Sequence, residues 1–181
     1  LLFGEGDMLT QKEAEPQKQP DPAPEGVTIL DKEVQVYKYL YEMKDKGVYI
    51  MLNHPHWSIL NSSEIGEENP YDAVELINYE TEWLENTGDG TIFWTEMLYK
   101  GCRLWGGGGD DNHNDYALDS LYCDSFGGFT MIMPDEFTYS GVIDAMEKGE
   151  MYSSMGPLFN EVSIEENRLH VECSDVKDIF V

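Results

Sequence analysis

Basic side chains are scarce in this chain. The sequence holds 11 lysines and arginines against 36 aspartates and glutamates, so the formal net charge of its 181 residues is −25. Because binding to a nucleic-acid backbone depends on basic side chains that displace its counterions, this charge opposes a nucleic-acid duplex as a partner. It predicts instead a solvated acidic surface that attracts cations, and bound metal ions could still create a site for a small phosphate ester.

Cysteines and long apolar runs are also few. Cys102, Cys123 and Cys173 are widely separated and form no Cys-x-x-Cys pair, which argues against a thiolate zinc site and a disulfide framework and predicts ordinary thiols in a core. No apolar run reaches the roughly 20 residues of a membrane-spanning helix, and the first residues lack the pattern of a signal peptide. The location in the cell stays open, with the cytoplasm favoured. Because the chain begins at Leu1 and not at Met, we expect that it has been trimmed.

Large apolar side chains are almost absent from residues 11–25, which hold half of the 8 prolines. A segment with so little to bury is expected to be an extended, solvated loop or linker, and we assign residues 1–25 to it. The whole chain is 41% hydrophobic and 12% aromatic, which is the composition of a globular domain.

From residue 26 onward, apolar patterns alternate between those of helices and those of strands. Short apolar runs predict strands at 48–52, 73–77, 102–105, 129–133 and 151–153, and helical spacing predicts helices from Asp31 to Gly47, over 92–100, and from the cap Thr138 to Lys148. This alternation implies parallel strands joined by right-handed crossovers, hence an α/β sheet or barrel. Residues 162–164 and 168–173 follow period 2 and predict a β-hairpin, which we take as the start of a β-rich module over 159–181.

Histidine is rare, and three of the 4 histidines follow predicted strands. His54 and His56 come directly after strand 48–52, and Asp111 and His113 follow strand 102–105. The carboxyl ends of parallel strands lie at one edge, where functional groups gather, and residues two apart in extended backbone point to the same side. Mixed nitrogen and oxygen ligands suit zinc, manganese or iron. The sequence therefore predicts a metal site that includes His54, Asp111 and His113.

Some residues near this site have two interpretations. Glu75 lies inside strand 73–77, beside Asn78 at its end; it either faces solvent or orients a metal-bound histidine through hydrogen bonds, because a buried carboxylate must be paired. The run Gly106–Gly109 lacks the Lys-Ser/Thr of a phosphate-binding loop, so it is either a plain loop or a backbone that turns tightly beside the site. We expect His170, in the hairpin, to be structural.

Taken together, the motifs resemble the C-terminal half of the PHP (polymerase and histidinol phosphatase) domain family. The resemblance covers residues 31–181 and is closest to the stand-alone metal-dependent phosphoesterase branch. Its motifs are Asn53-His54-Pro55-x-Trp57, Val74-Glu75-Leu76-x-Asn78, Trp94 with Leu98-x-x-Gly101, Gly108-x-Asp110-Asp111-x-His113-Asn114, and Gly156-Pro157.

This resemblance implies that residues 26–158 are the C-terminal part of a distorted (β/α)7 TIM-like barrel with a two- or three-metal cluster at its carboxyl edge. In the family, the matching positions make His54, Asp111 and His113 metal ligands. The implied reaction is hydrolysis of a phosphate mono- or diester by a metal-bound hydroxide. We expect the substrate pocket to be lined by His56, Trp57 and Asn114.

The departures from the family pattern leave other functions open. The family's opening His-x-His motif and its central Glu and His ligands would precede residue 1, and Asp110 replaces a residue that is usually small, which adds a charge beside the cluster. The chain as given could therefore be a catalytically inert fragment or a binding module. A third reading is an amidohydrolase-type enzyme that cleaves a C–N or carboxyl-ester bond, because metal-bound hydroxide attacks carbonyl and phosphoryl centres alike.

Overall fold

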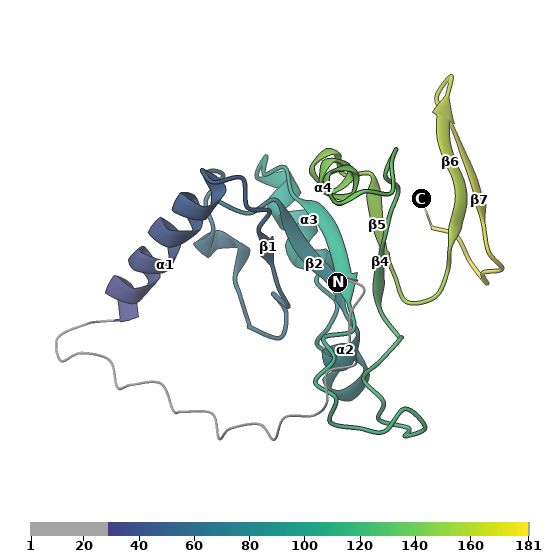
Figure 1. The fold of residues 1–181 in the computed structure, drawn as a ribbon, viewed down its shortest axis with the longest axis horizontal. Coiled ribbons are helices and arrows are strands. Elements are labelled where there is room, and N and C mark those ends of the chain that lie inside the picture. Colours follow the sequence, from purple (N-terminus) through teal and green to yellow (C-terminus); the bar gives the residue numbers. More distant parts are fainter. Residues whose placement is uncertain (1–28, 181) are drawn as a thin grey trace. The chain divides into compact units, whose positions relative to one another are not determined.

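The computed structural model describes residues 29–180, in which helices and strands alternate (Figure 1). The linker predicted over residues 1–25 lies outside the described residues. The helices are α1 (Ile29–Lys44), α2 (Tyr79–Glu85), α3 (Thr91–Tyr99) and α4 (Tyr139–Lys148), with a 3₁₀ turn, η1 (Ser62–Glu64). The strands are β1 (Met51–Leu52), β2 (Ala73–Asn78), β3 (Trp105–Gly109), β4 (Phe129–Ile132), β5 (Met151–Ser154), β6 (Phe159–Glu165) and β7 (Arg168–Cys173). No helix among these residues is both long and apolar enough to cross a membrane.

The central element is a parallel sheet in the strand order β1-β2-β3, which confirms a mixed α/β fold with parallel pairing. Strand β1 is shorter than the apolar run 48–52 predicts. Just before it, the Ile50 amide donates to the Asp72 side chain, with 2.9 Å between Ile50 N and Asp72 Oδ2.

The third strand begins three residues later than predicted, because it is built from the glycine run itself. Gly106 to Gly109 pair with Val74 to Asn78 of β2, so the interpretations of this run as a loop or a tight turn are wrong. The missing side chains have a packing reason. A Cβ on Gly108 would lie 2.9 Å from the Ile77 carbonyl oxygen on β2 and 3.1 Å from the Ser153 Cβ on β5. Only glycine lets the neighbouring strands approach so closely.

The strands β4 and β5 pair differently from the prediction. β4 and β5 are antiparallel to each other, with α4 between them in sequence, so the expectation that all strands are parallel is wrong. The helix itself is as predicted: the Thr138 side chain caps its first turn, and Gly149 ends it in the left-handed conformation. Thr130 links β4 to β3, because its Oγ1 lies 2.8 Å from Gly108 N and 2.7 Å from Gly108 O.

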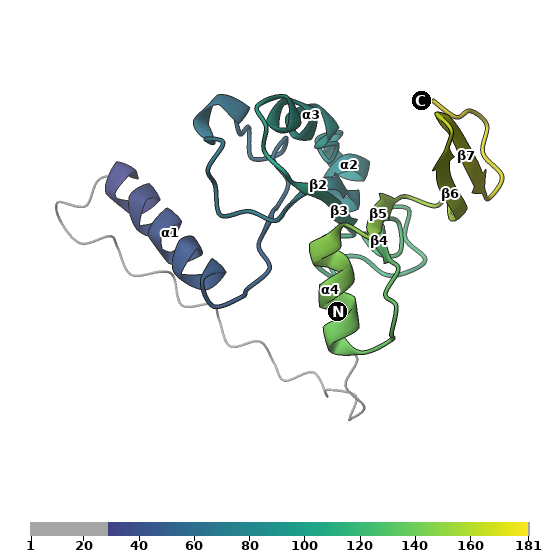
Figure 2. The same ribbon diagram turned by 90° about the horizontal axis from the view of Figure 1, so that it is seen from above.

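The main hydrophobic core lies between β2, α3 and the loops next to them (Figure 2). Val74 and Met97 are fully buried there and Phe93 nearly so. The side chain of Leu98 on the same helix is exposed and does not belong to this core. Trp94 takes its place: it packs against the core, and its Nε1 donates to the Leu104 carbonyl oxygen at 2.8 Å.

The predicted hairpin is confirmed as β6 and β7, which pair antiparallel with Glu166 and Asn167 in the turn at positive φ. Tyr152 joins the hairpin to β5: its Oη accepts a hydrogen bond from Phe159 N at 3.0 Å, and the two rings meet edge to face. All three cysteines are free, and only Cys102 is buried.

One buried hydroxyl gives a first prediction. Tyr49 Oη is buried and has no hydrogen-bond partner within the described part of the chain. Burial and, to a smaller extent, the carboxylates of Asp72 and Glu147 raise the pKa of Tyr49 to about 12. A tyrosine in the unfolded chain ionises near pH 10, below the pKa of Tyr49 in the folded chain. Ionisation of this residue therefore leaves the free energy of unfolding unchanged below pH 10 and lowers it as the pH rises toward 12.

Tyr49→Phe is therefore expected to stabilise the fold by about 1 kcal/mol at pH 7, because it removes a buried hydroxyl that has no partner. It is also expected to reduce the loss of stability between pH 10 and 12. Urea unfolding at pH 7, 10 and 11.5 measures both effects. Tyr99→Phe is the matched control, because Tyr99 is 87% exposed. A loss of stability in Tyr49→Phe at pH 7 would contradict the assignment.

Candidate metal centre

The carboxyl ends of the three parallel strands lead into the segments that carry the predicted site residues. His54 follows β1, the first residues of α2 follow β2, and residues 110–113 follow β3. Because neighbouring parallel strands end at the same edge of a sheet, residues far apart in sequence meet there. The edge location predicted from the sequence is therefore present for these three strands.

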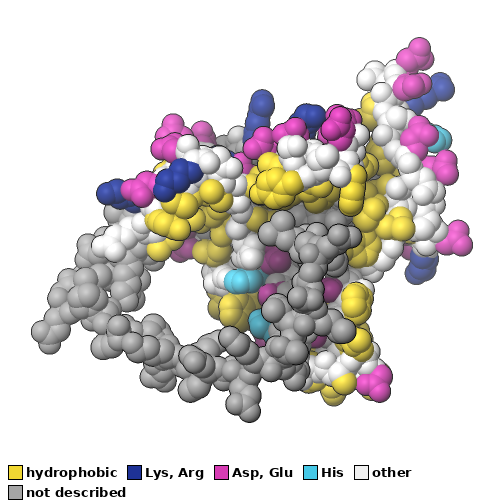
Figure 3. Space-filling view, in the orientation of Figure 1, with side chains coloured by type: hydrophobic (Ala, Val, Ile, Leu, Met, Phe, Trp, Pro, Cys, Tyr) yellow, Lys and Arg dark blue, Asp and Glu magenta, His cyan; other side chains and the backbone are white. Residues whose placement is uncertain are grey.

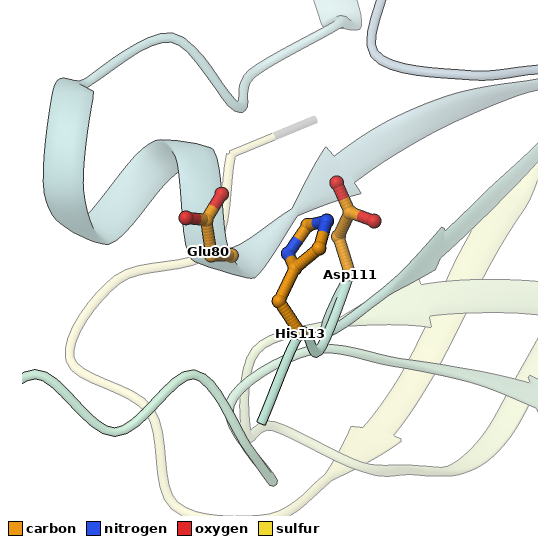
Figure 4. A group of neighbouring side chains, drawn as sticks. All are labelled: Glu80, Asp111 and His113. Carbon is orange, nitrogen blue, oxygen red and sulfur yellow. The ribbon is translucent and has the colours of Figure 1, made fainter. Parts of the chain in front are cut away.

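Three side chains form a group of possible metal ligands at this edge. Glu80, Asp111 and His113 each offer one ligand atom, and these atoms all lie within 4.8 Å of one another. Figure 4 shows the imidazole of His113 between the two carboxylates, with Glu80 on the first turn of α2 and the other two residues on the loop after β3. Asp111 and His113 thus meet as predicted, although Asp111 has a φ of 53° and is not extended. Their approach is a property of this loop and not of a strand.

Asp124 holds this loop in place. Its side chain is 2% exposed, and its two oxygens accept from the His113 amide at 2.8 Å and from Asn112 Nδ2 at 3.1 Å. A buried carboxylate with two donors fixes the backbone that carries the His113 ring. Sequence reasoning missed Asp124, and nothing in the pattern around it marks it.

The Asp110 side chain binds the backbone of the segment that leads into β4. Its carboxylate accepts hydrogen bonds from three consecutive backbone amides, those of Phe126 at 2.6 Å, Gly127 at 2.8 Å and Gly128 at 2.7 Å. The charge that Asp110 adds near the candidate ligands is therefore engaged by the chain that leads into β4.

A buried polar network connects the His54 loop to Asp111. Glu75 is 5% exposed, so the interpretation that it faces solvent is wrong. Its Oε2 accepts from the His54 backbone amide at 2.6 Å and from Asn78 Nδ2 at 3.2 Å. The same Asn78 nitrogen lies 2.8 Å from Asp111 Oδ2, and Asn78 Oδ1 caps α2 through the Thr81 amide. Glu75 therefore orients the backbone of His54, whereas Asn78 contacts a candidate ligand directly.

The surroundings of the site raise the pKa of two carboxylates, those of Glu75 and Glu80. Burial raises the pKa of Glu75, and hydrogen bonds from His54 and Asn78 oppose that rise only in part. Burial also raises the pKa of Glu80; the nearby carboxylates of Asp111, Glu85 and Asp124 add to the increase, while His113 opposes it. Several carboxylates thus lie close together, and this arrangement favours a bound cation.

The other predicted site residues are not members of this group. His54 does not belong to it: its Nδ1 lies 2.8 Å from Ser58 Oγ, and its ring meets the Trp57 ring edge to face at 5.2 Å. His56 and Trp57 line a separate groove. Asn114 is exposed, with a φ of 59°. His170 lies on β7, where it and the side chains of Glu161 and Glu172 form a second, fully exposed group of possible ligands.

Sequence reasoning also missed Glu80. A signal was present, because Glu80 comes two residues after Asn78, which ends β2, and the ends of parallel strands are where ligands are expected. One acidic residue in a chain with 36 of them does not stand out.

No model of a known protein family matches this chain, and no curated protein or solved structure matches it either. The resemblance to the PHP family therefore rests on the motifs of the sequence.

Proposed function

We propose that this chain carries the metal site of a hydrolase that acts on phosphate esters. The observation that supports the proposal is the group of Glu80, Asp111 and His113, whose ligand atoms lie within 4.8 Å of one another. Two carboxylates and one imidazole are a donor set that suits zinc, manganese or iron. The carboxylates around the group offer negative charge to a cation, which fits the same interpretation.

The proposed reaction follows from the openness of this group. Asp111 and His113 are exposed and Glu80 is half-buried, so water and substrate can reach the group from solvent. A divalent metal ion held by Glu80, Asp111 and His113 would activate water at neutral pH and would offset negative charge on a phosphoryl oxygen. In this proposal the chain's own residues orient the site: Asn78 holds the Asp111 carboxylate, and Asp124 holds the backbone of His113.

The barrel architecture is part of the same proposal. We propose that β1, β2 and β3 are consecutive strands of a distorted (β/α)7 barrel of the PHP type within residues 26–158, with residues 159–181 as the start of a β-rich module. The parallel order and the gathering of candidate ligands at one edge support this. The antiparallel pair β4 and β5 would be a local departure from the barrel.

Metal binding and hydrolysis are tested together on the 181-residue chain. We expect one Mn²⁺ or Zn²⁺ ion to bind at this site in isothermal titration calorimetry. With metal added, we expect hydrolysis of bis(4-nitrophenyl) phosphate or 4-nitrophenyl phosphate to exceed that of 4-nitrophenyl acetate. The His170→Ala variant serves as the background, because it removes the second ligand group on the hairpin.

The outcomes separate the competing functions. Faster cleavage of the acetate ester than of either phosphate would favour the amidohydrolase-type chemistry. Metal binding without hydrolysis of any substrate would favour an inert fragment or binding module. Absence of metal binding in the His170→Ala background would overturn the proposed site.

A further inference from the structure

A second feature of the molecule, separate from the metal centre, has the properties of a ligand site. It is a groove of about 740 Å³, which is within the range of about 300–1,000 Å³ that is typical of small-molecule sites. We call it the Trp57 groove. Its walls come from the loop after β1, the end of α2 and the first turns of α3, and its lining residues are His56, Trp57, Ile59, Leu60, Asn61, Ser62, Glu85, Thr87, Asp89, Ile92, Phe93 and Glu96.

One part of the lining is apolar and open to solvent. Ile59 is 90% exposed and Ile92 76% exposed, and the Trp57 ring lies half-exposed between loop and helix. The Trp57 ring has a defined orientation, because its Nε1 donates to Glu85 Oε2 at 3.1 Å and it forms an edge-to-face pair with the His54 ring. A fixed indole beside aliphatic side chains offers a surface for the apolar body of a ligand.

The other part of the lining is acidic and carries no counterion. Glu85, Asp89 and Glu96 line the groove, while no lysine or arginine does. Within residues 35–180, none of the ion pairs involves any of these three carboxylates. Ile92 and Glu96 are four residues apart on α3 and therefore share one face of the helix. Apolar contact and negative charge are thus presented together.

We propose that the Trp57 groove binds a small organic cation that joins an apolar, preferably aromatic, body to an ammonium group. The body lies against Trp57 and Ile92, and the ammonium group lies among the three carboxylates. An ammonium ion also interacts favourably with an indole face. The same three carboxylates would repel the head group of an anionic ligand of this shape. The proposal goes beyond the hydrolase function and does not depend on a bound metal.

Three probes that share a phenyl body and carry head groups of different charge test this proposal on the full chain. 2-Phenylethylamine is cationic, 2-phenylethanol is neutral and phenylacetate is anionic. Calorimetry and ligand-observed NMR at low salt, without added metal, give their affinities. We expect the amine to bind at least about fivefold more tightly than the alcohol, which corresponds to about 1 kcal/mol for the charged contacts. We expect no binding of phenylacetate at the same concentrations.

Substitutions in the groove and a control substitution outside it test whether the ligand binds in the groove. Glu96→Gln is expected to weaken binding of the amine about two- to fivefold and to leave the alcohol unchanged. Ile92→Ala is expected to weaken both. Both side chains are exposed, so neither substitution threatens the fold, and thermal melting checks this. Glu165→Gln, on the hairpin, removes one charge far from the groove in sequence and is expected to change neither affinity.

Three results would overturn the proposal. The first is equal affinity for the amine and the alcohol, which would make the groove merely apolar. The second is a loss of amine binding in Glu165→Gln as large as that in Glu96→Gln, which would mean attraction by the overall negative charge. The third is the absence of binding by all three probes. Since metal is absent from the assay, none of these results bears on the hydrolase function.

Discussion

His113→Ala is expected to weaken the binding of Mn²⁺ or Zn²⁺ to the candidate metal centre by about 100-fold or more. Loss of a group that merely orients a ligand costs about 10- to 100-fold in affinity, and loss of the ligand itself is expected to cost at least as much. His113 supplies the only nitrogen of the group, between the carboxylates of Glu80 and Asp111 (Figure 4). Glu80→Gln is expected to have a smaller but clear effect in the same direction, because the amide keeps the shape and loses the charge.

His54→Ala is the variant that separates two possible ligand sets. The sequence motifs make His54 a ligand together with Asp111 and His113, whereas the geometry groups those two residues with Glu80. If the geometric group is the site, His54→Ala retains one bound ion with an affinity close to that of the unmodified chain. If His54→Ala loses the ion and Glu80→Gln keeps it, the ligand set inferred from the motifs is right and Glu80 is not a ligand.

The same titration has an expected pH dependence. A proton competes with the metal for Glu80, whose pKa is raised by burial and by the neighbouring carboxylates. Metal affinity should therefore fall as the pH is lowered from 7 to 5. Glu80→Gln removes this group from the competition, so part of the pH dependence should disappear with it. An unchanged pH profile in Glu80→Gln would show that the ion does not contact Glu80.

Gly108→Ala is expected to destabilise the fold by about 2 kcal/mol, because extra volume in a closely packed position forces neighbouring atoms apart. The new Cβ would lie 2.9 Å from the Ile77 carbonyl oxygen and 3.1 Å from the Ser153 Cβ. Both contacts involve atoms at or next to the backbone of other strands, so no side-chain rotation can relieve them. Strand β3 would have to move away from β2 or from β5.

The adjacent glycine provides the matched control. Gly109 ends the same strand, and a Cβ there would have no neighbour within 4 Å. Gly109→Ala is therefore expected to change the free energy of unfolding by less than about 0.5 kcal/mol. Urea unfolding of both variants measures the difference. Equal effects of the two substitutions would mean that close approach of the strands is not the reason for glycine at position 108.

The overall charge agrees between sequence and structure. Many acidic side chains lie along the upper edge and on the right of the face seen in Figure 3, in keeping with the formal charge of −25.

Local chemistry determined much of the fold from the sequence alone. Helix α4 begins and ends where its cap residues Thr138 and Gly149 predict, and strand β2 follows its apolar run. The hairpin β6 and β7 follows from period-2 alternation. These features depend on backbone conformation and side-chain patterns within about ten residues, so no knowledge of distant neighbours is required.

The tertiary structure decided the features that depend on distant contacts. A run of four glycines has no strand propensity, and it became β3 because it pairs with β2. At Gly108, the neighbouring strands lie too close for a side chain. The direction of β5 relative to β4 likewise depends on pairing rather than on local pattern. Glu80 joined Asp111 and His113 because β2 and β3 lie side by side and end at one edge. Short-range patterns carry no information about such meetings, because they arise only when the chain folds back on itself.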